Sequence, residues 1–108
     1  MWQLWLDDDR YPGLVTIAAG WNWKLARNVD DAMWMIRTYG LPNFMSLDHD
    51  LGPDRMTGMD FCKQFTSYLM DNSINWPKDL GVYIHSQNPV GAKNMQSYLD
   101  NFKDQYAA

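Results

Sequence analysis

Two carboxylates and an imidazole follow one another directly after a short hydrophobic stretch. Residues 43–47 have the composition of a buried strand, and Asp48, His49 and Asp50 come next, before Gly52 turns the backbone. Charged groups are costly to bury without partners, so this cluster is a poor fit for a hydrophobic core. Its residue types suit a site that binds a ligand or transfers protons.

Polar residues also follow two other apolar stretches, residues 2–6 and 80–84. The first is followed by Asp7, Asp8 and Arg10, and the second by His85, Ser86 and Asn88. In open α/β sheets, ligands bind where the carboxyl ends of the strands meet. We therefore expect the three polar groups to converge at one edge of a sheet.

The elements that would position these groups can be recognised along the chain. Helices are predicted over residues 29–39 and about 59–70, and a last helix is predicted to start at Asn88. Strands alternate with these helices, which favours a parallel sheet with right-handed crossovers. A strand order of 2-1-3-4 would bring Asp7 or Asp8 close enough to Asp48 to share a cation.

The tryptophans are assigned by their positions in these elements. Trp2, Trp5 and Trp34 are expected in the core. Trp21 and Trp23 share one face of a predicted edge strand, where packing against the 29–39 helix competes with stacking on a base.

Composition limits the classes of protein to consider. The chain has 108 residues, 46% of them hydrophobic, which predicts one globular domain spanning residues 1–108. A net charge of −4 argues against a broad nucleic-acid-binding surface. No apolar run suits a membrane span or a signal peptide. The single cysteine, Cys62, excludes an internal disulfide and favours a reducing, cytoplasmic setting, with Cys62 itself buried and inert.

Four motifs resemble a known family. They are residues 6–10, 46–52, 58–60 and 85–91, and together they resemble the receiver domain of response regulators, most closely its cyclic-phosphate-processing variant. The resemblance implies a flavodoxin-like three-layer sandwich with a parallel sheet of about four strands in order 2-1-3-4, lacking the fifth strand and helix. It also implies that strand 4 is an open edge, a route to a homodimer. An ordinary receiver carries a lysine on its fifth strand and no histidine at the positions of His49 and His85. The absence of that lysine and the presence of both histidines argue against simple phosphorelay.

The acidic residues have two interpretations. Asp7, Asp8 and Asp48 would suit Mg²⁺ or Mn²⁺, or they form a solvated acidic loop with capping roles. Arg10 would hold a phosphate with two hydrogen bonds, or pair with the neighbouring acids. Asp50 would face the site or cap the turn before Gly52.

The remaining candidates would act on a phosphate or on protons. His49 and His85 could accept and donate protons, together with Asp48, in a metal-free mechanism, and either histidine could instead bind a metal. Ser86 and the following helix N-terminus would contact the phosphate. Asn88 would cap that helix or touch the ligand, and Gly91 would let the ligand approach closely.

Three functions follow from these interpretations. The first is a phosphodiesterase that opens a cyclic phosphate on a nucleotide, an RNA end or an ADP-ribose derivative. The second is a sensor or sponge that binds a cyclic nucleotide without cleaving it. The third is a degenerate receiver that acts through protein–protein contacts. In the first two, the partner is a small cyclic phosphate rather than a nucleic-acid or membrane surface.

Overall fold

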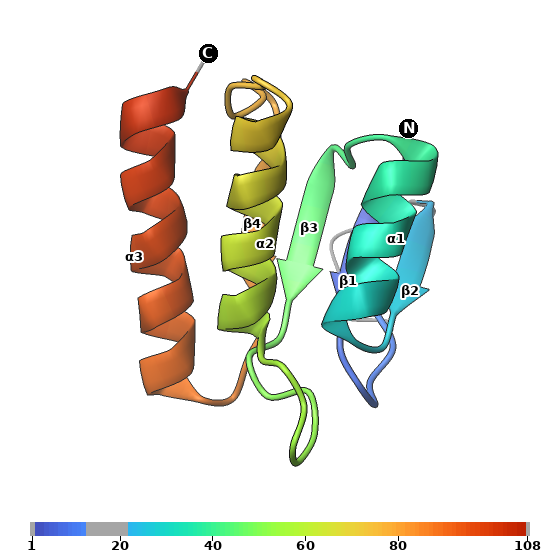
Figure 1. The fold of residues 1–108 in the computed structure, drawn as a ribbon. Helices are drawn as coiled ribbons and strands as arrows, with labels where there is room; N and C mark the ends of the chain where they lie inside the picture. The colour runs from blue at the N-terminus through green and yellow to red at the C-terminus, as the bar shows by residue number, and fades with distance from the viewer. Residues whose placement is uncertain (1, 13–21, 108) are drawn as a thin grey trace.

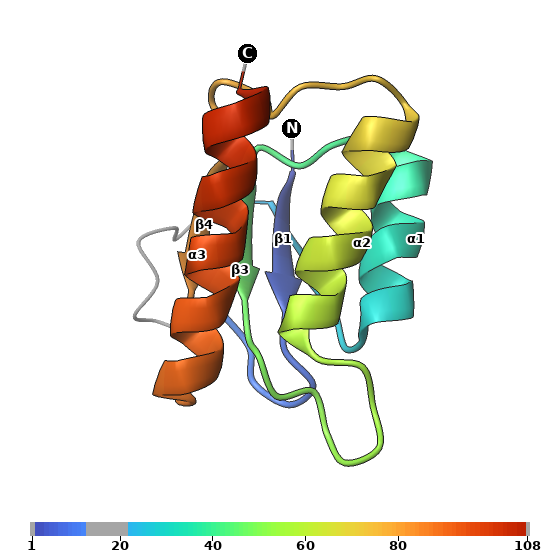
Figure 2. The same cartoon turned by 60° about the vertical axis from the view of Figure 1, so that its left-hand side comes forward.

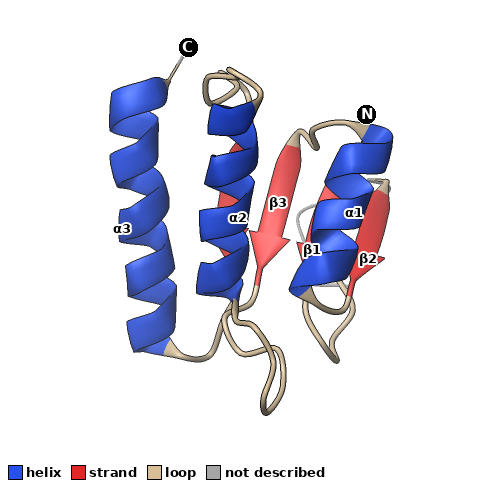
Figure 3. Cartoon of the chain, in the orientation of Figure 1, coloured by secondary structure: helices blue, strands red, loops and turns tan. Residues whose placement is uncertain are grey.

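The computed structural model describes residues 2–12 and 22–107. Its strands and helices alternate after an initial pair of strands. They are β1 (Gln3–Leu6), β2 (Trp23–Ala26), α1 (Val29–Tyr39), β3 (Phe44–Leu47), α2 (Gly58–Asp71), β4 (Gly81–Ile84) and α3 (Pro89–Tyr106) (Figure 1, Figure 3).

The four strands form one parallel sheet in the order β2-β1-β3-β4, which confirms the predicted order. In the register, Leu6 lies opposite Leu47, and Leu47 lies opposite Ile84. The backbone ladder continues one residue further, through the N–H groups of Asp48 and His85. The strand ends are therefore level, and Asp7, Asp48 and His85 leave the sheet at the same edge.

Helix ends are set by local hydrogen bonds that the sequence indicates. The side chain of Asn28 accepts from the backbone N–H of Asp31 at the start of α1. At the start of α2, Thr57 and Asp60 form a reciprocal capping box. These caps satisfy N–H groups that have no partner within the helix, and so they fix where each helix begins.

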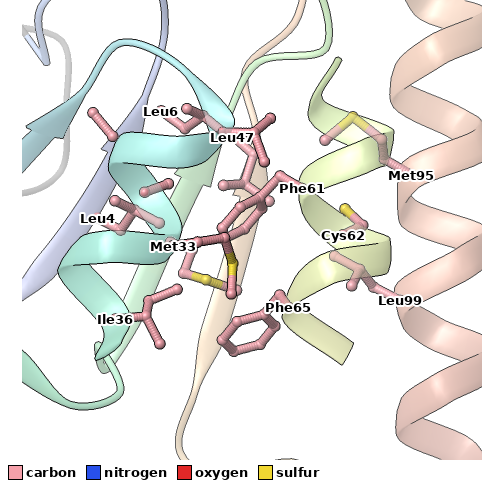
Figure 4. Packing of buried hydrophobic residues seen from close by; sticks show 14 of the residues in the cluster. Leu4, Leu6, Met33, Ile36, Leu47, Phe61, Cys62, Phe65, Met95 and Leu99 are labelled. Atoms are coloured by element: carbon pink, nitrogen blue, oxygen red, sulfur yellow. The ribbon is translucent and has the colours of Figure 1, made fainter. Parts of the chain in front are cut away.

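All three helices lie on one face of the sheet (Figure 1, Figure 2). The hydrophobic core fills the space between them and that face, as the close view of the packing shows (Figure 4). Leu4, Leu6 and Leu47 project into it from the strands, and Phe61 and Phe65 from α2; all five are fully buried. Burying such side chains contributes about 1.5–3 kcal/mol each, so this layer anchors the strand ends.

The opposite face of the sheet carries aromatic side chains. Trp23 packs edge-to-face on Trp5 and Phe44, with ring centroids 5.7 and 6.2 Å apart, whereas Tyr83 is 59% exposed. We call these four residues the aromatic face. The expected sandwich has three layers, of which the described residues supply the helical layer and the sheet; residues 13–21 lie outside the described part.

One prediction about the tryptophans is wrong, and one of the two alternatives for Trp23, packing against the 29–39 helix, is not found among the described contacts. Trp34 is 55% exposed rather than buried, because it lies on the face of α1 opposite the buried stripe of Val29, Ala32, Met33 and Ile36, where it packs edge-to-face on Tyr39. Trp23 belongs to the aromatic face, whereas its neighbour Lys24 points toward α1 and Tyr39. Trp2 and Trp5 are both 5% exposed, as predicted, and Trp21 lies outside the described residues.

Strand β4 hydrogen-bonds to β3 and forms one edge of the sheet among the described strands. Dimerisation through this edge stays a prediction. Within residues 2–12 and 22–107, no helix combines the length and the apolar character needed to cross a membrane.

Candidate functional site

Asp7 and Asp48 form a buried acid pair at the ends of β1 and β3, with exposures of 1% and 6%. Oδ1 of Asp7 accepts the backbone N–H groups of Asp9 and Arg10, at 2.9 and 2.8 Å. Burial by itself would raise the pKa of Asp7, but these backbone donors, with His85 and the Arg10 charge, lower it. The Asp7 carboxylate is therefore held ionised.

Arg10 bridges the two acids. Its Nε lies 2.8 Å from Oδ2 of Asp7, and its outer nitrogen NH2 lies 3.3 Å from Oδ2 of Asp48. Partial burial would lower the pKa of Arg10, but the two carboxylates raise it. Of the two interpretations of Arg10, its pairing with the acids is the one found here, and a phosphate contact stays a prediction.

His85 lies against the acid pair with both ring nitrogens engaged. Its Nε2 is 3.0 Å from Oδ2 of Asp7, and its Nδ1 is 2.8 Å from Oγ of Ser46. The ring stacks on Trp5 at 4.1 Å between centroids and 5° between planes. Burial lowers the pKa of His85, although Asp7 opposes this effect.

A neutral His85 has one arrangement that fits both contacts. The Asp7 carboxylate accepts only, so Nε2 carries the hydrogen, and Nδ1 accepts from the Ser46 hydroxyl. His85 could exchange a proton with a ligand only after one of these bonds breaks.

His49 is held differently. Its Nδ1 lies 2.7 Å from Oδ1 of Asp50, and this hydrogen bond lowers the pKa of Asp50. With Nδ1–H donating to a carboxylate, Nε2 presents a lone pair, and none of the described hydrogen bonds uses that atom. The His49 side chain is 20% exposed, so a ligand or a water molecule can reach the ring.

The start of α3 contacts the hydrogen-bonded pair of His49 and Asp50. Asn88 caps the helix by accepting from the N–H of Gly91 at 3.0 Å, as predicted. Its amide nitrogen lies 3.4 Å from Oδ1 of Asp50 and 3.5 Å from Nδ1 of His49. A Cβ added to Gly91 would lie 2.5 Å from Cγ of His49. Gly91 therefore makes room for the imidazole, a protein group rather than the ligand expected there.

The first turn of α3 offers fewer free donors to an anion than the sequence suggests. Proline has no N–H, Gly91 donates to the Asn88 side chain, and Ala92 donates to the Asn88 carbonyl. Among the described hydrogen bonds, this leaves the N–H of Val90. The hydroxyl oxygen of Ser86 accepts from the N–H of Asn88 at 3.0 Å, which orders the turn before the helix.

The metal ligands expected from the sequence are only partly brought together. Within the described residues, Asp7, Asp48 and His85 each offer an atom within 4.8 Å of the others. Asp8 is exposed and lies outside this group. The group does not fit a divalent ion as arranged, because Arg10 already donates to both carboxylates and His85 donates to Asp7.

Three residues contact the site without having been expected there: Ser46, Trp5 and Arg27. Ser46 precedes Asp48 by two positions, and Trp5 precedes Asp7 by two, so each pair shares a strand face. That alternation was a usable signal. Arg27 donates to the Asp7 carbonyl at 2.9 Å, a contact that no spacing in the sequence indicates.

The model of one protein family, described as the cyclic-phosphate processing receiver domain, matches residues 2–101. The chain belongs to this family. The match spans every described strand and α3 as far as Asn101, together with both histidines and the acid pair. No curated protein matched the chain. The receiver-like fold therefore rests on the family match together with the observed sheet order, and the association with cyclic-phosphate processing rests on the family match.

Proposed function

We propose that this receiver domain hydrolyses a cyclic phosphodiester, with His49 as the general base. The observation that carries the proposal is the His49–Asp50 hydrogen bond of 2.7 Å, which holds Nδ1 as a donor and leaves Nε2 as an acceptor that none of the described hydrogen bonds uses. A carboxylate that holds one imidazole nitrogen as a donor fixes the other as an acceptor, which suits proton abstraction. The family's association with cyclic-phosphate processing supports the choice of substrate class.

The reaction opens one ester bond of the ring. His49 Nε2 accepts a proton from water, the water oxygen bonds to phosphorus, and the bond from phosphorus to one ring oxygen breaks. The departing alkoxide takes a proton from solvent on the opposite side of phosphorus, because the entering and leaving oxygens lie in line. General-base catalysis of this type contributes about 10²–10⁴-fold.

The neighbouring groups would bind and orient the phosphate. Ser86 and the N–H of Val90 would contact its oxygens at the start of α3, where the helix dipole favours an anion. Arg10, which lies next to the acid pair, would provide positive charge. We assign His85 to holding Asp7 in place, since both of its nitrogens are bonded to protein.

The test is incubation with 2′,3′-cyclic nucleotides, 3′,5′-cyclic nucleotides and ADP-ribose cyclic phosphates, each with and without EDTA. We expect EDTA-insensitive opening of at least one class, a loss of about 10²–10⁴-fold in kcat for His49→Gln, and a smaller loss for Asp50→Asn. Gln87→Ala changes an exposed neighbour of Ser86 and should retain the activity.

Full turnover by His49→Gln would overturn the assignment of the base. A ligand that binds and is recovered intact after heat denaturation would instead support the sensor or sponge function. Circular dichroism of each variant would verify that the fold is kept.

A further inference from the structure

We propose that the guanidinium of Arg10 is the resident counter-cation of the acid pair, occupying the place where a divalent ion would otherwise bridge Asp7 and Asp48. In this arrangement the domain neutralises its own acids, and a divalent ion binds them well only when Arg10 is removed. The inference concerns the acid pair alone and does not depend on the proposed hydrolysis.

The contacts of Arg10 resemble those of a bridging ion. One guanidinium reaches Oδ2 of Asp7 at 2.8 Å and Oδ2 of Asp48 at 3.3 Å. The remaining oxygens already have donors, since Oδ1 of Asp7 accepts two backbone N–H groups and Oδ1 of Asp48 accepts the N–H of His49. A divalent ion would have to take the oxygens that Arg10 now holds.

Charge makes the competition stronger. Two carboxylates and one guanidinium leave one net negative charge, and a neutral His85 adds none. A divalent ion bound beside Arg10 would meet a like charge at close range in a buried site, where screening by solvent is weak. With Arg10 removed, the ion would meet two carboxylates with no positive charge between them. Among the described hydrogen bonds, the one from His85 to Oδ2 of Asp7 would then be the one from a side-chain donor that the ion still has to share or displace.

The backbone of Arg10 is fixed independently of its side chain. Its carbonyl accepts from Nε1 of Trp5 at 2.9 Å and from NH1 of Arg27 at 2.6 Å. Truncating the side chain leaves both bonds possible, because both involve the carbonyl. The 42% exposure of the Arg10 side chain also means that its loss opens the acid pair to solvent rather than creating a closed cavity.

The experiment measures Mn²⁺ binding by calorimetry and by the EPR signal of free Mn²⁺, with no substrate present. We expect Arg10→Ala to bind Mn²⁺ at least tenfold more tightly than the natural sequence, which corresponds to about 1.4 kcal/mol. Arg10→Lys keeps the charge and should resemble the natural sequence. Arg37→Ala removes the same charge from the exposed last turn of α1 and should leave the affinity unchanged.

A second substitution locates the site. Asp48→Asn in the Arg10→Ala background should abolish the gain. Arg10→Gln, which keeps a polar side chain, replaces Arg10→Ala if the latter does not fold. Equal affinity of the natural sequence and the Arg10 variants, or no measurable binding to any of them, would overturn the proposal.

Discussion

Gly91→Ala tests whether the start of α3 holds the His49 ring. The added Cβ would lie 2.5 Å from Cγ, 2.6 Å from Cδ2 and 2.9 Å from Nδ1 of that ring. All three distances are shorter than ordinary van der Waals contact, so the ring must move. Because the nearest atoms belong to a side chain rather than to the backbone, we expect the variant to fold with His49 displaced.

The magnitude follows from two opposing effects. Crowding of this kind costs about 1–3 kcal/mol, whereas alanine in place of glycine in a helix gains up to about 1 kcal/mol. We therefore expect the free energy of unfolding to fall by about 1–2 kcal/mol. In a His49→Ala background the crowding disappears, and the same change should stabilise the protein by up to about 1 kcal/mol. The coupling between the two positions is then about 2–3 kcal/mol.

Urea denaturation monitored by tryptophan fluorescence measures the coupling. The four proteins compared are the natural sequence, Gly91→Ala, His49→Ala and the double variant. The slope m should stay constant, so that shifts in the midpoint report stability alone. If Gly91→Ala changes the free energy of unfolding equally with and without His49, the proposed contact between residue 91 and the ring is refuted.

Three further predictions concern other parts of the structure. Gly58→Ala should destabilise the fold far more than Gly91→Ala, since its Cβ would overlap the backbone oxygen of Asp48; a small change in urea midpoint would contradict this. The pKa of His85 is lowered in the native protein. In the unfolded chain His85 therefore gains its proton near pH 6.5, whereas in the native protein it gains the proton only at a lower pH. Stability should be full above pH 6.5 and decline below it, by about 1.4 kcal/mol per unit of difference; the lowered pKa of Asp7 adds a further loss below 3.8. His85→Gln should remove the decline in stability that begins near pH 6.5, and an unchanged decline would contradict the role given to His85. Cys62 is buried, which raises its pKa to about 12, so Ellman's reagent should label it only on unfolding, and rapid labelling of the native protein would disprove its burial.

Much of the fold could be predicted because local signals and long-range pairing agree. Asn28 and Asn88 indicate where α1 and α3 begin, because asparagine side chains cap helix N-termini. The helices between the strands impose crossovers, and these make the sheet parallel. Trp34 was misplaced because its large apolar side chain was weighed above its position: the helical period puts it opposite the buried stripe of α1, where it packs on Tyr39 at the surface.

The location of the candidate site could be predicted from the sequence, but the hydrogen bonds and ion pairs among its side chains could not. Level strand ends bring Asp7, Asp48 and His85 together, and the predicted topology already implied this. Which donor meets which oxygen depends on side-chain geometry between residues as far apart as His85 and Asp7, 78 positions along the chain. Sequence spacing cannot distinguish a guanidinium from a metal ion between two acids, or a histidine bonded on both sides from one with a basic nitrogen.

The two hydrogen bonds to the Arg10 carbonyl also limit which atoms must move when the guanidinium leaves the acid pair. Since Trp5 and Arg27 hold the backbone at this position, moving the guanidinium requires only rotation about side-chain bonds. Such rotations in exposed side chains take picoseconds to nanoseconds, whereas loop rearrangements take nanoseconds to microseconds. Once its two ion pairs break, the guanidinium can therefore leave the acids without a rearrangement of the loop backbone, so ligand entry requires motion of one side chain only.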